Sequence, residues 1–162
     1  MSVVIRRDAR VLWGSLLAAL LLTILPMPVA IEDFRPPWMA LVLIFWSLTL
    51  PERVGVFTAF GAGLVLDVTT GALLGHHALG LAVIVYMMIE LHQRVRTFPL
   101  WQQTLVVWVL LLLERLLYLW VLSATGQLTP TLYYWVPTFI GALLWPWVYA
   151  VLRDLGRRAG VL

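Results

Sequence analysis

The chain alternates long apolar runs with short polar breaks, a pattern typical of helices that cross a membrane. A helix needs about 20 apolar residues to cross a hydrocarbon core about 30 Å thick. The run at 54–91 is long enough for two crossings joined near 67–77. The run at 38–50 is short, and a tilted crossing or a crossing of a thinned bilayer is favoured over a re-entrant hairpin. The pattern therefore predicts six helical spans, at residues 11–31, 38–50, two within 54–91, 100–123 and 132–152.

Apart from Arg115, the arginines lie in the breaks rather than in the runs. Cytoplasmic flanks of membrane helices collect positive charge, because such flanks resist translocation. With six spans and an inside N-terminus, only Arg35 falls outside, whereas the inside positions are Arg6, Arg7, Arg10, Arg53, Arg94, Arg96, Arg153, Arg157 and Arg158. We therefore expect a multi-pass membrane protein with both termini in the cytoplasm. Four spans with re-entrant middle segments would also keep both ends inside.

Composition narrows the class of protein further. Hydrophobic residues make up 62% of the chain and charged residues 12%, which leaves too little polar surface for a soluble globular protein. No polar stretch is long enough for a separate soluble domain, so residues 1–162 are expected to form a single all-α transmembrane domain. The isoelectric point near 9.8 reflects arginines in short flanks beside apolar spans, which suits anionic membrane lipid and not nucleic acid.

Small residues recur every four positions on the expected third helix, at Gly55, Ala59 and Gly63. Such a face lets a neighbouring helix approach closely, which is how helices pack tightly in lipid. The spacing leaves two partners open, another helix of this chain or a separate protein, and internal packing is favoured.

Asp67 follows this face and opens a glycine-rich stretch that must reverse the chain near the membrane surface. Gly71 and Gly75 within the stretch allow the positive φ values that a tight reversal needs. The Asp67 carboxylate could cap the next helix by accepting backbone N–H bonds, or it could pair with a cation inside the bundle. His76 and His77 are adjacent and would point about 100° apart on a helix, so they form a poor metal pair and we expect no metal.

Glu114 and Arg115 are the charged residues in the middle of an expected span. Each would cost about 2.5–3.5 kcal/mol at the centre of an isolated helix, so neither is expected to face lipid. Sequence neighbours do not face each other on a helix, and each residue therefore needs a separate partner. Asp67 or Glu90 is the candidate for Arg115, while Glu114 could reach a tyrosine hydroxyl or be protonated. A buried polar pin that fixes helix register is favoured over a transport or catalytic role.

Motifs of intramembrane catalysis are missing from the sequence. The chain contains no His-Glu-x-x-His, no Gly-x-Ser-x-Gly and no phosphate-binding Walker sequence, and it has no cysteine. An enzyme of this kind needs a reactive group with a partner that activates it. We therefore expect neither catalysis nor a cofactor.

The glycine-rich stretch has a pattern that resembles a known family. It reads Gly-Leu-x-x-Asp-x-x-x-Gly-x-x-x-Gly-x-x-Ala-Leu, at Gly63, Leu64, Asp67, Gly71, Gly75, Ala78 and Leu79. This pattern is similar to that of the MreD family of bacterial rod shape-determining membrane proteins. The chain length, the apolar runs, the arginine-tipped tails and the turn at Pro51, Glu52 and Arg53 extend the resemblance over essentially the whole chain.

The resemblance implies a non-enzymatic inner-membrane scaffold of the cell-elongation complex. A member of this family would bind MreC and help couple cytoplasmic MreB filaments to the synthase and the transpeptidase that build peptidoglycan. The resemblance also implies a six-helix bundle similar to the substrate-binding subunits of energy-coupling vitamin transporters. Within this picture we predict that the glycine-rich hairpin and the small-residue face form the rigid part of the scaffold on which MreC docks.

The similarity of fold leaves a second function open, a solute-binding subunit of a membrane transporter with Asp67, Glu114 and Arg115 as ligands. Fold alone does not settle function. Such subunits usually carry an Ala-x-x-x-Ala face on the first helix, and the run at 11–31 has no such spacing. The scaffold hypothesis is therefore favoured.

Overall fold

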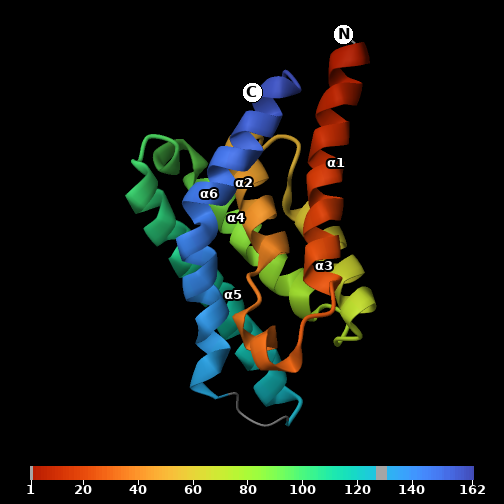
Figure 1. Cartoon of the computed structure of the whole chain (residues 1–162), viewed down its shortest axis with the longest axis vertical. Helices are drawn as coiled ribbons and strands as arrows, with labels where there is room; N and C mark the ends of the chain where they lie inside the picture. Colours follow the sequence, from red (N-terminus) through yellow and green to blue (C-terminus); the bar gives the residue numbers. More distant parts are fainter. Residues whose placement is uncertain (1, 127–130) are drawn as a thin grey trace.

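The computed structural model describes residues 2–126 and 131–162, with side chains from residue 9 onward except residue 33. This part of the chain forms six α-helices and two short 3-10 helices, without a strand (Figure 1). The elements in chain order are α1 (Ser2–Ile24), η1 (Val29–Phe34), α2 (Trp38–Thr49), α3 (Val56–Thr70), α4 (His76–Val95), α5 (Leu100–Ala124), η2 (Leu132–Trp135) and α6 (Val136–Arg158). The predicted all-α bundle of about six helices is confirmed.

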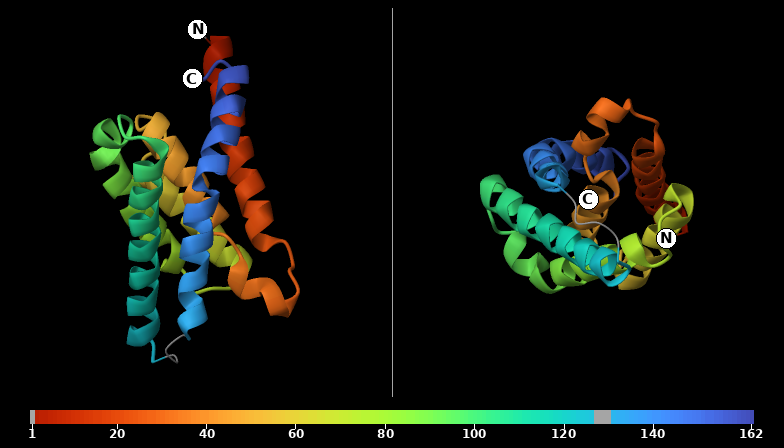
Figure 2. Two further views of the ribbon diagram at one scale, coloured as in Figure 1. Left: turned by 60° about the vertical axis from the view of Figure 1, so that its left-hand side comes forward. Right: turned by 90° about the horizontal axis from the view of Figure 1, so that it is seen from below.

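Consecutive α-helices run in opposite directions, so the start of α1 and the end of α6 lie at the same end of the bundle (Figures 1 and 2). We call this the terminal end; it also holds the turns at 50–55 and 96–99. The opposite end, which we call the hairpin end, holds η1, the α3–α4 turn at 71–75 and η2. The tails and turns that carry the predicted inside arginines therefore share the terminal end, whereas Arg35 directly follows η1 at the hairpin end.

Three helical stretches are long and apolar enough to cross a membrane, at His76–Val95, Leu100–Ala124 and Leu132–Arg158. Shorter apolar helices lie at Ala9–Ile24, Trp38–Thr49 and Val56–Thr70. The prediction of a first span at 11–31 is wrong at its end, because α1 stops at Ile24 and residues 29–34 form η1. Pro26 and Pro28 explain the break, since proline lacks a backbone N–H and disfavours helical geometry in the residue before it.

α2 is the shortest α-helix and lies at the centre of the bundle, where α1, α4, α5 and α6 contact it (Figure 2). Every residue from Met39 to Leu48 is buried. A helix that is apolar on all sides must be surrounded by protein or by lipid. The 12 residues of α2 rise only about 18 Å, and this length is tolerated because its sides meet other helices instead of the bilayer.

Two arginines stabilise the C-terminal ends of the short helices α1 and α2. Arg35 donates to the carbonyl oxygen of Thr23 near the end of α1. Arg96 donates to the carbonyl oxygen of Leu48 at 2.9 Å and to that of Thr49 at the end of α2. The last carbonyl groups of a helix have no partner within it and carry the negative end of its dipole, so a cation stabilises them.

Candidate functional site

The Asp67 carboxylate, near the end of α3, caps the beginning of α4. Its Oδ2 accepts the backbone N–H of Gly75 at 2.9 Å and that of Ala78 at 3.4 Å. Its Oδ1 accepts the backbone N–H of His77 at 2.8 Å and also lies 2.8 Å from the His77 Nδ1. The Asp67 side chain is 0% exposed. We call this set of contacts the Asp67 clasp; of the two alternatives for Asp67, it shows the capping one, with a histidine as an additional partner.

Two glycines shape the turn that brings α4 back to Asp67. Gly71 follows α3 with a φ of 69°, and Gly75 precedes α4 with a φ of 94°. Residues with a Cβ rarely adopt these left-handed values, because the Cβ meets the neighbouring carbonyl oxygen. Ala72 donates its N–H to the Asp67 carbonyl oxygen at 3.0 Å. Both the backbone and the side chain of Asp67 therefore close the turn.

Gly63 lies one helical turn before Asp67 and touches the backbone of α4. A Cβ at Gly63 would lie 2.3 Å from the Cα of Ala78 and 2.6 Å from its nitrogen. Ala59, one turn earlier on α3, is fully buried, whereas Gly55 precedes α3 with open space around it. The small-residue face therefore serves internal packing at Ala59 and Gly63, and Gly55 takes no part in it.

Arg115 has aromatic partners. Its guanidinium carbon lies 5.0 Å from the ring centre of Tyr134 and 5.9 Å from that of Tyr118. Cations are attracted to the faces of aromatic rings at such distances. The Tyr134 hydroxyl also donates to the Arg115 carbonyl oxygen at 3.0 Å, which links η2 to α5. The guanidinium is thus held in place by rings rather than by a carboxylate.

The structure does not contain the predicted ion pair of Arg115 with Asp67 or Glu90. These three residues all lie in the described part of the chain, and no side-chain N···O contact within 4.0 Å joins the guanidinium to either carboxylate. The carboxylate of Asp67 is already engaged by the clasp. Glu90 is exposed and lies about four helical turns from the hairpin end of α4. Asp67 is therefore excluded as the partner of Arg115 by its contacts in the clasp, and Glu90 by its distance along α4.

Glu114 packs against α4 without a hydrogen bond from its side chain to another described residue. A Cβ at Gly80 would lie 3.0 Å from the Cγ of Glu114, so α4 and α5 approach closely at this point. The predicted contact of Glu114 with a tyrosine hydroxyl is not formed. No ion pair within 4.0 Å joins Glu114 to a described cation, and the other alternative, a protonated Glu114, stays a prediction.

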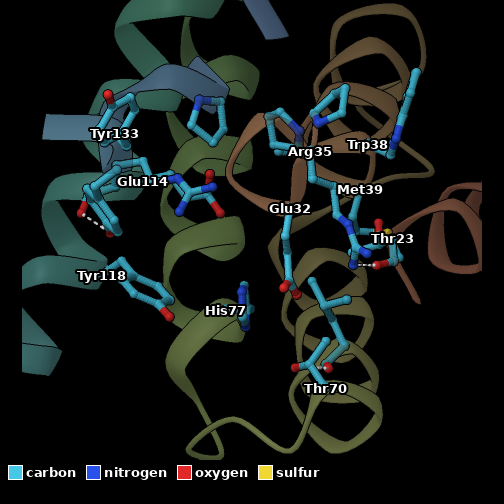
Figure 3. A pocket seen from close by; sticks show the side chains of 17 residues that line it. Thr23, Glu32, Arg35, Trp38, Met39, Thr70, His77, Glu114, Tyr118 and Tyr133 are labelled. Atoms are coloured by element: carbon cyan, nitrogen blue, oxygen red, sulfur yellow. Dashed lines mark hydrogen bonds between the residues drawn. The ribbon is translucent and has the colours of Figure 1, made fainter. Parts of the chain in front are cut away.

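A cavity of about 270 Å³ lies at the hairpin end, bordered by η1, the facing ends of α3 and α4, α5 and η2 (Figure 3). Glu32 and Arg35 lie on one side of it, and Glu114, Tyr118 and Tyr133 lie on the other. The polar lining residues are Thr23, Glu32, Arg35, Thr70, His77, Glu114, Arg115, Tyr118, Tyr133 and Tyr134. The bundle therefore contains a space whose walls carry charges of both signs.

The three predicted ligand residues thus lie in two neighbouring groups. Asp67 lies in the clasp, and Glu114 and Arg115 line the cavity. Glu32 and Arg35 were not predicted to line a site, because the order of the spans along the sequence does not show which loops come together in space. The one signal for them was that Arg35 is the single arginine on the predicted outer side.

His76 lies next to the clasp and is itself buried. Its ring centre is 3.6 Å from that of Tyr118, and neither ring nitrogen has a hydrogen-bond partner in the described part of the chain. Among the described residues, no three His, Asp or Glu side chains come together in a way that could hold a metal ion.

Comparisons with known proteins agree with the family that the glycine-rich pattern resembles. A family model described as rod shape-determining protein MreD matches residues 6–155. The chain is 32% identical over 143 residues to the rod shape-determining protein MreD of Haemophilus influenzae, and the match covers 86% of each chain. No solved structure matches the chain. The chain therefore belongs to the MreD family of rod shape-determining proteins, and its role lies in cell shape.

Proposed function

We propose that the chain is a non-enzymatic scaffold of the cell-elongation complex in the bacterial inner membrane. In this role it binds MreC and helps couple cytoplasmic MreB filaments to the synthase and the transpeptidase of peptidoglycan synthesis. Family membership over most of the chain is the observation that carries the proposal. Three helices long and apolar enough to cross a membrane support the location.

The Asp67 clasp suggests where the rigid part of this scaffold lies. A rigid docking surface loses little conformational freedom when a partner binds, and the clasp joins α3 and α4 into one unit. Ala59 and Gly63 are covered by the chain itself, so they support the surface from within. We propose that MreC docks on the outer side of the hairpin, where Val68 and Leu74 are exposed.

Co-purification of MreC from membranes solubilised in mild detergent tests this docking surface. Gly71→Val places a β-branched side chain at a φ of 69°, which strains the hairpin without adding a steric clash. We expect this variant to insert into the membrane, to recover several-fold less MreC, and to leave rod-shaped cells round.

Gly14→Val is the matched control, because Gly14 lies on α1 with ordinary φ and open space around it. It should keep both MreC recovery and rod shape. Normal MreC recovery and normal rods with Gly71→Val would contradict docking on the hairpin, and failure of the unaltered chain to recover MreC would contradict the scaffold role itself.

The proposed orientation places the terminal end in the cytoplasm, since that end collects the arginines of the tails and turns. The chain has no cysteine, so single cysteines report on sidedness directly. Thr70 and Thr97 are both exposed, at opposite ends of the bundle. An impermeant thiol reagent should label Thr70→Cys in intact spheroplasts and Thr97→Cys only after the membrane is opened; the reverse pattern would invert the orientation.

A second candidate function is a solute-binding subunit of a transporter, and the polar cavity is the observation that favours it. The two functions differ in their partners. Recovery of an ATPase module together with solute uptake, in cells whose shape is unaffected by loss of the protein, would favour the transporter. Recovery of MreC with loss of rod shape would favour the scaffold.

A further inference from the structure

We infer that the cavity at the hairpin end binds a small zwitterionic group, with its ammonium beside Glu32 and its phosphate or carboxylate beside Arg115. The head group of phosphatidylethanolamine carries both charges, and it is the occupant to which we commit. The inference concerns the cavity and not the outer face of the hairpin. It therefore stands or falls separately from the docking of MreC.

The charges on the cavity walls favour a zwitterion over a simple anion or cation. On one wall, the Glu32 carboxylate forms no side-chain hydrogen bond or ion pair with a described residue, so it offers a free anionic acceptor. Arg35 beside it keeps its positive charge, but two of its N–H groups already donate to the carbonyl oxygens of Thr23 and Leu25. On the other wall, Arg115 of α5 supplies a positive charge, beside the Glu114 carboxyl group, whose Cγ packs against Gly80 of α4. A ligand that matches both walls must therefore carry both signs.

These side chains form no ion pairs with one another. No ion pair within 4.0 Å involves Glu32, Glu114 or Arg115 in the part of the chain that the structure describes. Charged side chains within a membrane bundle are costly unless they meet an opposite charge, a polar partner or water. The rings of Tyr118 and Tyr134 hold the guanidinium in place, so Arg115 is oriented before an anionic group arrives.

Size and depth favour a lipid head group as the source of the zwitterion. About 270 Å³ is slightly below the range of about 300–1,000 Å³ that is typical of small-molecule sites, so the cavity suits a head group and not a large solute. Trp38 and Tyr133 also line it, and amphipathic aromatic rings concentrate at the depth of lipid head groups. Pro36 and Leu66 add an apolar wall for the linking methylene groups.

Native mass spectrometry of the full, delipidated protein in detergent tests the inference by titration with three probes. The probes are phosphatidylethanolamine, phosphatidylglycerol with the same acyl chains, and free phosphoethanolamine. We expect phosphatidylethanolamine to bind about tenfold more tightly than phosphatidylglycerol, since the latter lacks the ammonium that Glu32 would hold.

Two variants separate the two charges of the ligand. Arg115→Gln should weaken binding of both lipids about tenfold, because both contain the phosphate. Glu32→Gln should weaken phosphatidylethanolamine alone, and it should fold normally because Glu32 is exposed outside the α-helices. Arg94→Gln is the matched control, since Arg94 is exposed and lies near the terminal end, away from the cavity. It should bind all three probes as the unaltered protein does.

The binding of free phosphoethanolamine decides the source. If it binds as tightly as the lipid, the zwitterion site stands and its natural occupant is a soluble molecule; if it binds far more weakly, the lipid is the occupant. The inference is overturned if phosphatidylglycerol binds as well as phosphatidylethanolamine, or if Glu32→Gln leaves phosphatidylethanolamine binding unchanged.

Discussion

The Asp67 clasp and the polar cavity are neighbours at the hairpin end, yet their charged groups are satisfied in opposite ways. The Asp67 carboxylate accepts three backbone N–H groups and contacts the His77 ring. Arg115, at the cavity, faces two tyrosine rings and no carboxylate within 4.0 Å among the described residues. The chain's own atoms complete the first region, whereas the second leaves charge available to another molecule.

The comparison distinguishes a charged group that stabilises the fold, Asp67, from one that is available to bind a ligand, Arg115. In a low-dielectric bundle, a complete hydrogen-bond network fixes one arrangement, while an incomplete network is costly. His77 belongs to both regions, since it contacts Asp67 and also lines the cavity. The clasp therefore gives the cavity one rigid wall.

Gly63→Leu should have the largest effect on folding, because it forces the backbones of α3 and α4 apart where they touch. A Cβ at this position would overlap the Ala78 Cα at 2.3 Å, and no rotamer of the new side chain relieves that overlap. We expect a loss of about 3 kcal/mol of unfolding free energy, at the upper end of the usual cost of overpacking. Unfolding by sodium dodecyl sulfate in mixed micelles measures it.

Gly61→Leu on the same helix is the matched control, since a Cβ there meets nothing within 4 Å. Its unfolding free energy should change little. Equal stability of the two variants would show that α3 and α4 do not approach as closely as described.

Asp67→Ala should have the next largest effect, about 2–4 kcal/mol, because it removes a helix cap and leaves buried backbone N–H groups without an acceptor. Asp154→Ala is the control, since Asp154 forms an exposed pair with Arg158 on α6 and such pairs contribute little. The same detergent unfolding assay compares the two. Equal effects of both substitutions would mean that the clasp does not stabilise the fold.

Arg115→Met should have the smallest effect on stability, within about 1 kcal/mol, because no buried carboxylate partner is left stranded by the change. Arg96→Met should cost more, since it exposes the carbonyl oxygens of Leu48 and Thr49 at the end of α2. Melting temperatures of the two variants in detergent give the order. A larger loss for Arg115→Met would indicate that Arg115 is part of the fold and not of the cavity.

The architecture could be predicted from the sequence because its signals are local. Each apolar run predicts a helix by itself, and the arginines indicate which helix ends lie on the same side of the membrane. The prediction for 38–50 was less complete, since an apolar run does not distinguish lipid from protein as its surroundings. Only the packing shows that α2 is the central helix.

The site was harder to predict because its parts come from distant segments. For Asp67, capping and ion pairing were both open, and the choice depended on where the N–H groups of Gly75 and His77 come to lie. The partner of Arg115 was predicted wrongly, since sequence spacing does not reveal that Tyr134 reaches it from η2. The cavity itself joins η1 to α5 and could not be inferred from either alone.

A double-mutant cycle between Asp67 and Arg115 tests the separation of clasp and cavity most directly. Unfolding free energies are measured for Asp67→Ala, for Arg115→Met and for the double variant. A second cycle, with Asp67→Ala and His77→Phe, serves as the reference. We expect the effects of Asp67→Ala and Arg115→Met to add within about 0.5 kcal/mol, and Asp67 and His77 to show a coupling of about 1 kcal/mol or more. Strong coupling between Asp67 and Arg115 would contradict this separation.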